Sequence, residues 1–227
     1  MWNPGEVFRT TGCLVKWYRW GMPRRYVLRA RAETAAQTRT EILEVARQTL
    51  LASERLEFSV GEVAAAAGVA RSTVYAAFGS RAGLLAMLAD DALHSSGLDE
   101  VIAAFMDADA VVALEESLRA SCRMYGAQHR LFRRLLALGE VDPEAAAPIA
   151  RSATDRAQGM VNLATRLAAQ GRLRAGESVE RAADTLALVT SFAAFDELYS
   201  GRRLDADAAA DLLIDVARRS VLAPQGP

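Results

Sequence analysis

The stretch from Ser59 to Leu85, SVGEVAAAAGVARSTVYAAFGSRAGLL, decides how the rest of the chain is interpreted. Ser59 is a favourable helix N-cap, and Glu62 follows three residues later, which is the pattern of a capping box. Gly68 stands where a left-handed residue ends the helix after about two turns. The stretch therefore predicts a short helix, a tight turn, a second helix from about Arg71 to Phe78, and a third helix that begins near Ser80.

The two short helices present different surfaces. The first has a narrow apolar face of small side chains, and the second buries Val74 and Phe78. The outward face of the second is polar and rich in hydroxyl groups, and it consists of Arg71, Ser72, Thr73 and Tyr75. Because helices this short are unstable alone, the pair is typical of a helix-turn-helix, whose second helix enters a DNA major groove. The alternative is that both are connector helices in an all-α core.

The segment AAGVARSTVYAAFGSRAGLL closely resembles the signature of the TetR family of transcriptional regulators. The match has no gaps, and it rests on Gly68, Val69, Thr73, Tyr75, Phe78, Ser80, Leu84 and Leu85. Three positions depart from the family pattern, since Ala70 replaces Ser, Ser72 replaces Gly and Arg81 replaces Lys. Arg81 keeps the charge, whereas Ala70 removes the N-cap hydroxyl of the second helix, at a typical cost of about 1 kcal/mol.

On this resemblance we expect Ser59, Thr73, Tyr75 and Arg81 to contact phosphates, and Arg71 and Ser72 to contact base edges. The segment TRTEILEVARQTL resembles the first helix of the family, with Arg39 near its beginning as a further candidate for a phosphate contact. That helix is predicted to start near Thr34 or Thr38, each of which has a capping-box partner three residues later. A solvated helix-end arginine is the alternative role for Arg39.

Positive charge is concentrated at the start of the chain. The whole chain has a formal net charge of −1, but residues 1–33 hold seven basic and two acidic residues. We predict that residues 1–33 form a basic, largely flexible arm, whose contacts with DNA come from Arg24, Arg25, Arg29 and Arg31. An alternative is that translation begins at Met22; these four arginines are retained in either case.

Beyond the arm, the sequence predicts an all-α protein with two domains. Residues 34–80 form a three-helix DNA-binding head, and residues 81–227 form a helical domain for effector binding and dimerisation. Asp109, Asp142 followed by Pro143, and Asp207 are predicted helix starts in this second domain. The segment from Val179 to Tyr199 carries apolar residues on two faces, which suits the four-helix bundle that the family builds from its last two helices across a two-fold axis. Burial within one chain is the alternative.

No residue pattern indicates catalysis or metal binding. His94 and His129 are the only histidines and have no metal-ligand partners at suitable spacing, and the chain carries no Gly-rich phosphate loop. We therefore expect no enzyme activity, no cofactor and no metal. A membrane partner is not expected either, because no run of about 18 uncharged apolar residues exists. The two cysteines, Cys13 and Cys122, suit a reducing cytoplasm.

The resemblance also implies an effector cavity in the second domain. The candidate lining residues are Met87, Phe105, Met106, Cys122, Tyr125, His129, Phe132, Met160, Asn162 and Phe192, although any of them can equally be plain core. A mostly apolar lining favours a small lipophilic molecule. The sequence thus predicts a homodimeric repressor that an effector of unknown identity releases from a palindromic double-stranded DNA operator. The rival interpretations are a DNA-binding regulator without an effector and a helical small-molecule binder that has lost DNA binding.

Overall fold

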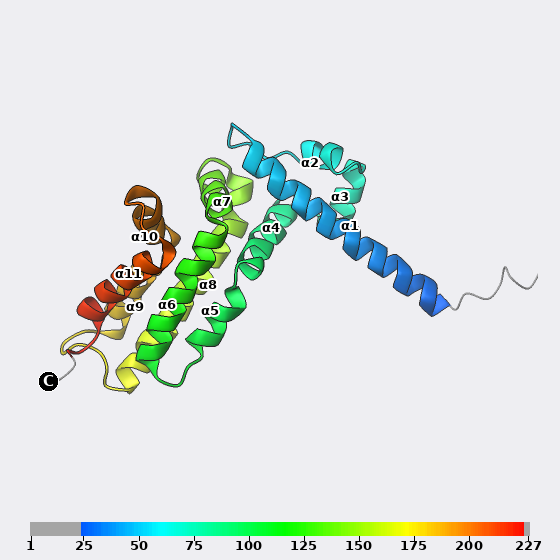
Figure 1. Cartoon of the computed structure of the whole chain (residues 1–227). Helices are drawn as coiled ribbons and strands as arrows, with labels where there is room; N and C mark the ends of the chain where they lie inside the picture. The colour runs from blue at the N-terminus through cyan, green and yellow to red at the C-terminus, as the bar shows by residue number, and fades with distance from the viewer. Residues whose placement is uncertain (1–23, 225–227) are drawn as a thin grey trace, which may run out of the picture. The chain divides into compact units, whose positions relative to one another are not determined.

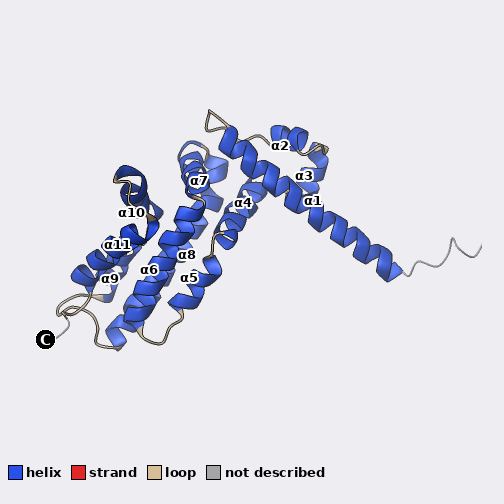
Figure 2. Cartoon of the chain, viewed as in Figure 1, coloured by secondary structure: helices blue, strands red, loops and turns tan. Residues whose placement is uncertain are grey.

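A computed structural model describes the backbone of residues 24–224, and the side chains from residue 33 onward. Within these residues every regular element is helical, as Figure 1 and Figure 2 show, and Leu173 and Leu222 form one isolated β-bridge. The all-α prediction is confirmed. The elements are α1 (Arg24–Ala52), α2 (Val60–Ala66), α3 (Arg71–Phe78), α4 (Arg81–Ser95), α5 (Leu98–Phe105), α6 (Ala110–Ala127), α7 (His129–Val141), α8 (Pro143–Ala169), α9 (Val179–Val189), α10 (Phe192–Asp196), a π-helical turn η1 (Glu197–Gly201) and α11 (Ala206–Val221).

Helix α1 begins ten residues before the predicted start at Thr34, because it covers Arg24–Ala52. The predicted start is therefore wrong. Pro23 is the last proline before α1, and no Gly or Pro occurs from Arg24 to Ala52, so nothing in this segment ends a helix. The arginines at 24, 25, 29 and 31 lie on helical backbone, while the predicted flexibility of residues 1–23 falls outside the described residues.

The chain divides into two compact units, of which the second runs from Ile42 to Pro227. In the second unit, one buried apolar cluster extends from the end of α1 through α2, α3 and α4 into the later helices. Helix α8 packs against α4, α7 and α9, and α6 packs against α5 and α11. Helix α4 therefore shares its core with the residues that precede it and with those that follow it.

The segment that the sequence predicts as one helix, from Val179 to Tyr199, is interrupted. Helix α9 ends at Val189. Ser191 then caps α10, because its hydroxyl group accepts from the backbone N–H of Ala194 at 3.1 Å, and η1 follows α10. The final helix is capped by Asp205, whose carboxylate accepts from the N–H of Ala208 at 2.8 Å. The prediction of Asp207 as this cap is wrong, because the chain is already helical from Ala206.

Candidate nucleic-acid interface

The helix-turn-helix predicted from residues 59–85 is present, and its capping groups hold it together. The hydroxyl group of Ser59 accepts from the N–H of Gly61 at 3.2 Å at the start of α2. Gly68 has a φ of +66°, the left-handed conformation that glycine adopts without strain, and it ends this helix. The N–H of Val69 then bonds to the carbonyl of Ala64 at 3.0 Å, which closes the turn into α3. Val60, Val63, Ala64, Val74 and Phe78 are all buried.

The outward face of α3 carries the polar residues that the sequence singled out. Arg71 and Ser72 are exposed, Thr73 is half-buried, and Tyr75 is 47% exposed although its ring is large and apolar. These four side chains lie on one short helix whose opposite side is fixed by the buried Val74 and Phe78. A rigid helix with an exposed, donor-rich face is the arrangement that reads base edges in a major groove.

Arg71 rests against the neighbouring helix. A methyl group placed on Gly61 would lie 2.5 Å from Nη2 of Arg71, so the guanidinium packs against the backbone of α2 at Gly61. Arg39 is exposed on α1. Its contact with phosphate stays a prediction. The role of the four arginines at the start of α1 also stays a prediction, because the side chains of residues 24–32 lie outside the described part.

Ala70 leaves α3 without a side-chain cap, as the sequence predicts. Its backbone is extended (φ −71°, ψ 149°), which is the N-cap conformation, and only its carbonyl takes part, accepting from the N–H of Thr73 at 2.9 Å. By contrast, the hydroxyl group of Ser80 caps α4 through the N–H of Gly83 at 3.0 Å. Helix α3 is thus held chiefly by packing on its buried side.

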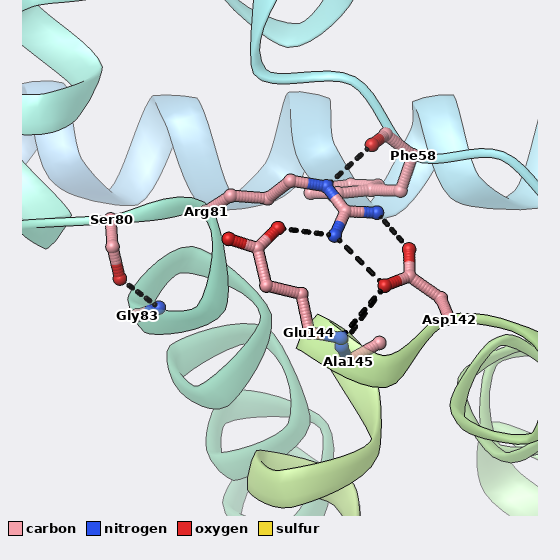
Figure 3. Close-up of polar contacts among 7 residues, drawn as sticks. All are labelled: Phe58, Ser80, Arg81, Gly83, Asp142, Glu144 and Ala145. Carbon is pink, nitrogen blue, oxygen red and sulfur yellow. Dashed lines mark hydrogen bonds and ion pairs between the residues drawn. The ribbon is translucent and has the colours of Figure 1, made fainter.

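Arg81, a predicted phosphate contact, has a different set of partners in the structure (Figure 3). Its Nε donates to the carbonyl of Phe58 at 2.8 Å, and Nη1 donates to Asp142 at 3.2 Å and to Glu144 at 2.9 Å. Nη2 forms a second bond to the Asp142 carboxylate. We call these four residues the Arg81 junction. Hydrogen bonds from Arg81 lower the pKa of Asp142, and those to the two carboxylates raise the pKa of Arg81.

Four of the predicted effector residues meet in one aromatic cluster. Tyr125 contacts Phe132 and Phe192 edge to face, with ring centroids 5.6 and 5.3 Å apart, and His129 stacks on Phe192 at 5.8 Å. Two further rings, Phe195 and Tyr199, complete the cluster. Their spacing of three and seven residues from Phe192 predicts that all three rings lie on one apolar face of the segment from Val179 to Tyr199. Of the three, only Phe192 was predicted to line the effector cavity.

Polar groups lie at two edges of this cluster. On one edge, Nε2 of His129 lies 2.6 Å from the carboxylate of Asp196, to which Ser200 also donates at 2.8 Å. Burial opposes ionisation of Asp196, but the bonds from His129 and Ser200 outweigh it and lower its pKa.

On the other edge, the hydroxyl group of Tyr125 reaches the carbonyl of Thr190 at 3.4 Å, and Arg156 donates to the Thr190 hydroxyl group at 3.0 Å. Sequence reasoning missed Thr190, Asp196 and Arg156 as polar neighbours of the cluster, because the residues that they bond to lie 65, 67 and 34 positions away in the sequence.

The remaining effector candidates differ in their exposure. Met87, Met106 (72% exposed) and Asn162 lie at the surface, and Phe105 is half-buried against Gly159. On α4 and α8 the buried stripe is formed by neighbours such as Leu88 and Leu163, so Met87 and Asn162 face the other way. Cys122 and Met160 are buried, and burial raises the pKa of the Cys122 thiol to about 12. This thiol is therefore an unreactive part of the packed core.

A surface hollow of about 490 Å³ lies next to the aromatic cluster, and Tyr199 belongs to both. Its other lining residues are Arg123, Gly126, Ala127, Arg203, Leu204, Asp205 and Ala206. In the part of the chain that the structure describes, no group of three or more His, Cys, Asp or Glu side chains is arranged to hold a metal ion. Among the same residues, no helix is both long and apolar enough to cross a membrane.

Comparison with known proteins agrees with this geometry. Residues 42–88 match the family model described as "Bacterial regulatory proteins, tetR family". No curated protein sequence matches the chain. The matched segment contains α2, α3 and most of α4, and so it includes the whole exposed face of α3.

Solved structures with a similar fold include transcriptional regulators. NalD, the secondary repressor of the MexAB-OprM multidrug efflux pump in Pseudomonas aeruginosa, has a TM-score of 0.67 and 22% identity, over 85% of this chain and all of its own. A tetR-family regulatory protein from Rhodococcus RHA1 has a TM-score of 0.62 and 20% identity, over 83% of this chain and 98% of its own. PfmR, a TetR-family regulator from Thermus thermophilus, has a TM-score of 0.59 and 21% identity, over 78% of this chain and 97% of its own.

Proposed function

We propose that this chain, whose residues 42–88 match the tetR family model, is a DNA-binding transcriptional regulator. It is a cytoplasmic homodimeric repressor that a small lipophilic effector releases from a palindromic operator. The observation that carries this proposal is the exposed polar face of α3, whose opposite side is buried in the helix-turn-helix through Val74 and Phe78. The matched family and the structural neighbours are regulators and not enzymes.

The residues on α3 are assigned two kinds of contact. Arg71 and Ser72, at the exposed start of the helix, contact base edges, because N-terminal residues of a recognition helix reach furthest into the major groove. Tyr75 and Thr73 donate to phosphates, together with Ser59 at the start of α2. Phosphate contacts set the register on DNA, and base contacts set the sequence preference.

Binding-site selection from random duplexes tests this assignment. Arg71→Ala is expected to relax the selected sequence at the positions that Arg71 contacts, whereas Tyr75→Phe weakens binding to every site alike. Tyr75→Phe keeps the ring and removes only the hydroxyl group, so it serves as the matched control. If Arg71→Ala returns the wild-type sequence unchanged, the assignment of Arg71 to base reading is wrong.

The arginines at the start of α1 are assigned to the phosphate backbone. Replacing Arg24, Arg25, Arg29 and Arg31 by Gln keeps good helix-forming residues and removes the charge. Each lost phosphate contact lowers the slope of log K against log salt by about 0.9. An unchanged slope for the fourfold variant would show that these arginines do not contact DNA.

The dimer is assigned to α9 and α11, which contact one another. Leu188 on α9 is 69% exposed, and Leu212 and Val216 on α11 are also exposed although all three are apolar. Exposed apolar residues on two neighbouring helices are typical of a surface that a second copy of the chain covers. Phe192, Phe195 and Tyr199 instead pack within the chain, so the interface is assigned to the part of the segment nearer Leu188.

The effector is assigned to the aromatic cluster of Tyr125, His129, Phe132 and Phe192. Its rings favour a lipophilic molecule, and the hydroxyl group of Tyr125 and the His129–Asp196 pair supply polar contacts at the edges. A lipophilic compound that raises the melting temperature of the wild-type protein and not of a Phe192→Ala variant would support this site. Equal stabilisation of both proteins would place the binding site elsewhere.

A further inference from the structure

We propose that Arg81 is a positioning residue through which the first turn of α8 holds the loop between α1 and α2. By holding this loop, Arg81 also positions Ser59, the N-cap of α2 and a proposed phosphate contact. The proposal concerns regulation of the proposed DNA-binding function and rests on it. It assigns to Arg81 a role different from the direct phosphate contact that the family resemblance implies.

The first step is the link from Arg81 to α2. The Nε bond of 2.8 Å holds the carbonyl of Phe58, and the guanidinium carbon lies 6.0 Å from the centre of the Phe58 ring. Phe58 directly precedes Ser59, whose hydroxyl group and carbonyl accept from the N–H groups of Gly61 and Val63. A displacement of Arg81 therefore moves the N-cap of α2, which is itself a proposed phosphate contact.

The second step is the link from Arg81 to α8. The Asp142 carboxylate that accepts from Arg81 also caps α8, since it accepts from the N–H groups of Glu144 at 3.0 Å and Ala145 at 3.3 Å (Figure 3). Pro143 fixes the first helical position. The carboxylate is thus held by the backbone of α8, and the Arg81 and Asp142 side chains are only 20% and 21% exposed. Any movement of the first turn of α8 is transferred to Arg81.

A second arginine holds the other end of the same loop. Arg134, on α7, donates from Nη2 to the carbonyl of Ser53, just after the end of α1. The carbonyls at both ends of the α1–α2 loop, Ser53 and Phe58, are therefore bound by guanidinium groups. One of these belongs to α7 and the other is anchored on α8. The α1–α2 loop is thus bound directly by α7, through Arg134, and indirectly by α8, through Arg81 at the first position of α4.

Most of the donors of Arg81 are already occupied. Nε, Nη1 and Nη2 together form four bonds to Phe58, Asp142 and Glu144, out of the five N–H groups that a guanidinium offers. A DNA phosphate would compete for Arg81 with two carboxylates that belong to the same chain. A positioning role and a direct phosphate role therefore predict opposite effects for variants of Asp142.

Hydrogen exchange of the intact protein, followed by mass spectrometry, tests the junction without DNA. Asp142→Asn is the informative variant, because Asn is as good an N-cap as Asp, while it loses the charge and replaces one of the two oxygens that accept from Arg81 by an NH2 donor. Arg81→Gln and Asp142→Asn are each expected to speed exchange in residues 53–66 by about tenfold, and the double variant by no more than either alone. Arg218→Gln, which breaks a paired contact with Glu115 on α6, is the control and leaves residues 53–66 unchanged.

The proposal is overturned if Asp142→Asn changes exchange only in the first turn of α8, or if the effects of the two single variants multiply in the double variant. A second measurement uses the duplex obtained by binding-site selection. Both variants are expected to weaken binding by similar factors with an unchanged salt slope. If Arg81→Gln lowers the slope by about 0.9 while Asp142→Asn binds as well as wild type, Arg81 is a phosphate contact and the proposal is wrong.

These two measurements also separate the proposal from the function on which it rests. If no duplex is selected, the proposed function fails, and the exchange experiment still decides whether Arg81 couples α8 to the head.

Discussion

Restoring the missing cap of α3 by Ala70→Ser is expected to stabilise the protein. Ala70 already has the extended backbone of an N-cap residue, is exposed, and lies directly before Arg71, the first residue of α3. Ser59 and Ser80, which have extended backbones at the starts of the neighbouring helices, accept from backbone N–H groups at 3.2 and 3.0 Å. A serine at position 70 can therefore accept from the N–H of residue 72 or 73 without a change in the backbone.

The expected gain is about 1 kcal/mol, the typical difference between Ser and Ala at an N-cap. For a chain of this size that corresponds to a rise of roughly 2 to 4 °C in melting temperature. With a denaturant slope of roughly 2 to 3 kcal/mol/M, the urea midpoint would rise by about 0.3 to 0.5 M. The protein concentration must be held constant, because a dimer is stabilised by mass action.

The matched control is Ala76→Ser on the same helix. Ala76 is also exposed, but it lies in the interior of α3, where Ser is less favourable than Ala by about 0.5 kcal/mol. The two substitutions introduce the same side chain and should shift the urea midpoint in opposite directions. A midpoint for Ala70→Ser that equals or falls below wild type would refute the capping argument.

Other substitutions probe separate parts of the structure. Gly83→Ala should destabilise by roughly 1 to 3 kcal/mol, since a methyl group there would lie 2.1 Å from the carbonyl of Phe78; an unchanged urea midpoint would contradict this close approach. Leu188→Arg should convert the dimer to a monomer in light scattering, and a dimer that persists would move the interface elsewhere. The lowered pKa of Asp142 stabilises the fold above its ordinary pKa of about 3.9, and this stabilisation is lost as the pH falls through the lowered value. Acid unfolding of Arg81→Gln, followed by circular dichroism, should therefore show less of this pH dependence than wild type, and identical curves would contradict the assignment.

The head could be predicted from the sequence because its signals are local. The bounds of α3 follow from Gly68, Val74 and Phe78, which lie within a few residues of one another, and the missing cap at Ala70 follows from residue type alone. The caps at Ser59, Ser80, Asp109 and Asp142 were predicted for the same reason.

The features that the sequence did not predict depend on tertiary contacts or on missing stop signals. The break after Val189 contains no Gly or Pro; Arg156, distant in the sequence, bonds to the carbonyl of Ala187 and the hydroxyl group of Thr190 where α9 ends. The partners of Arg81 lie 61 and 63 residues away, so no local pattern reveals them. The early start of α1 was missed because Thr34 resembles an N-cap although nothing before it breaks the helix.

The central claim is that this chain recognises a particular DNA sequence through α3. The most direct measurement is a titration of the selected duplex and a scrambled duplex of equal length at about 50 mM and about 150 mM salt. We predict that the selected duplex remains bound tightly at the higher salt, by two protomers with half-sites about 34 to 36 Å apart, while the scrambled duplex is released. Equal affinities for both duplexes at about 150 mM salt would contradict the claim.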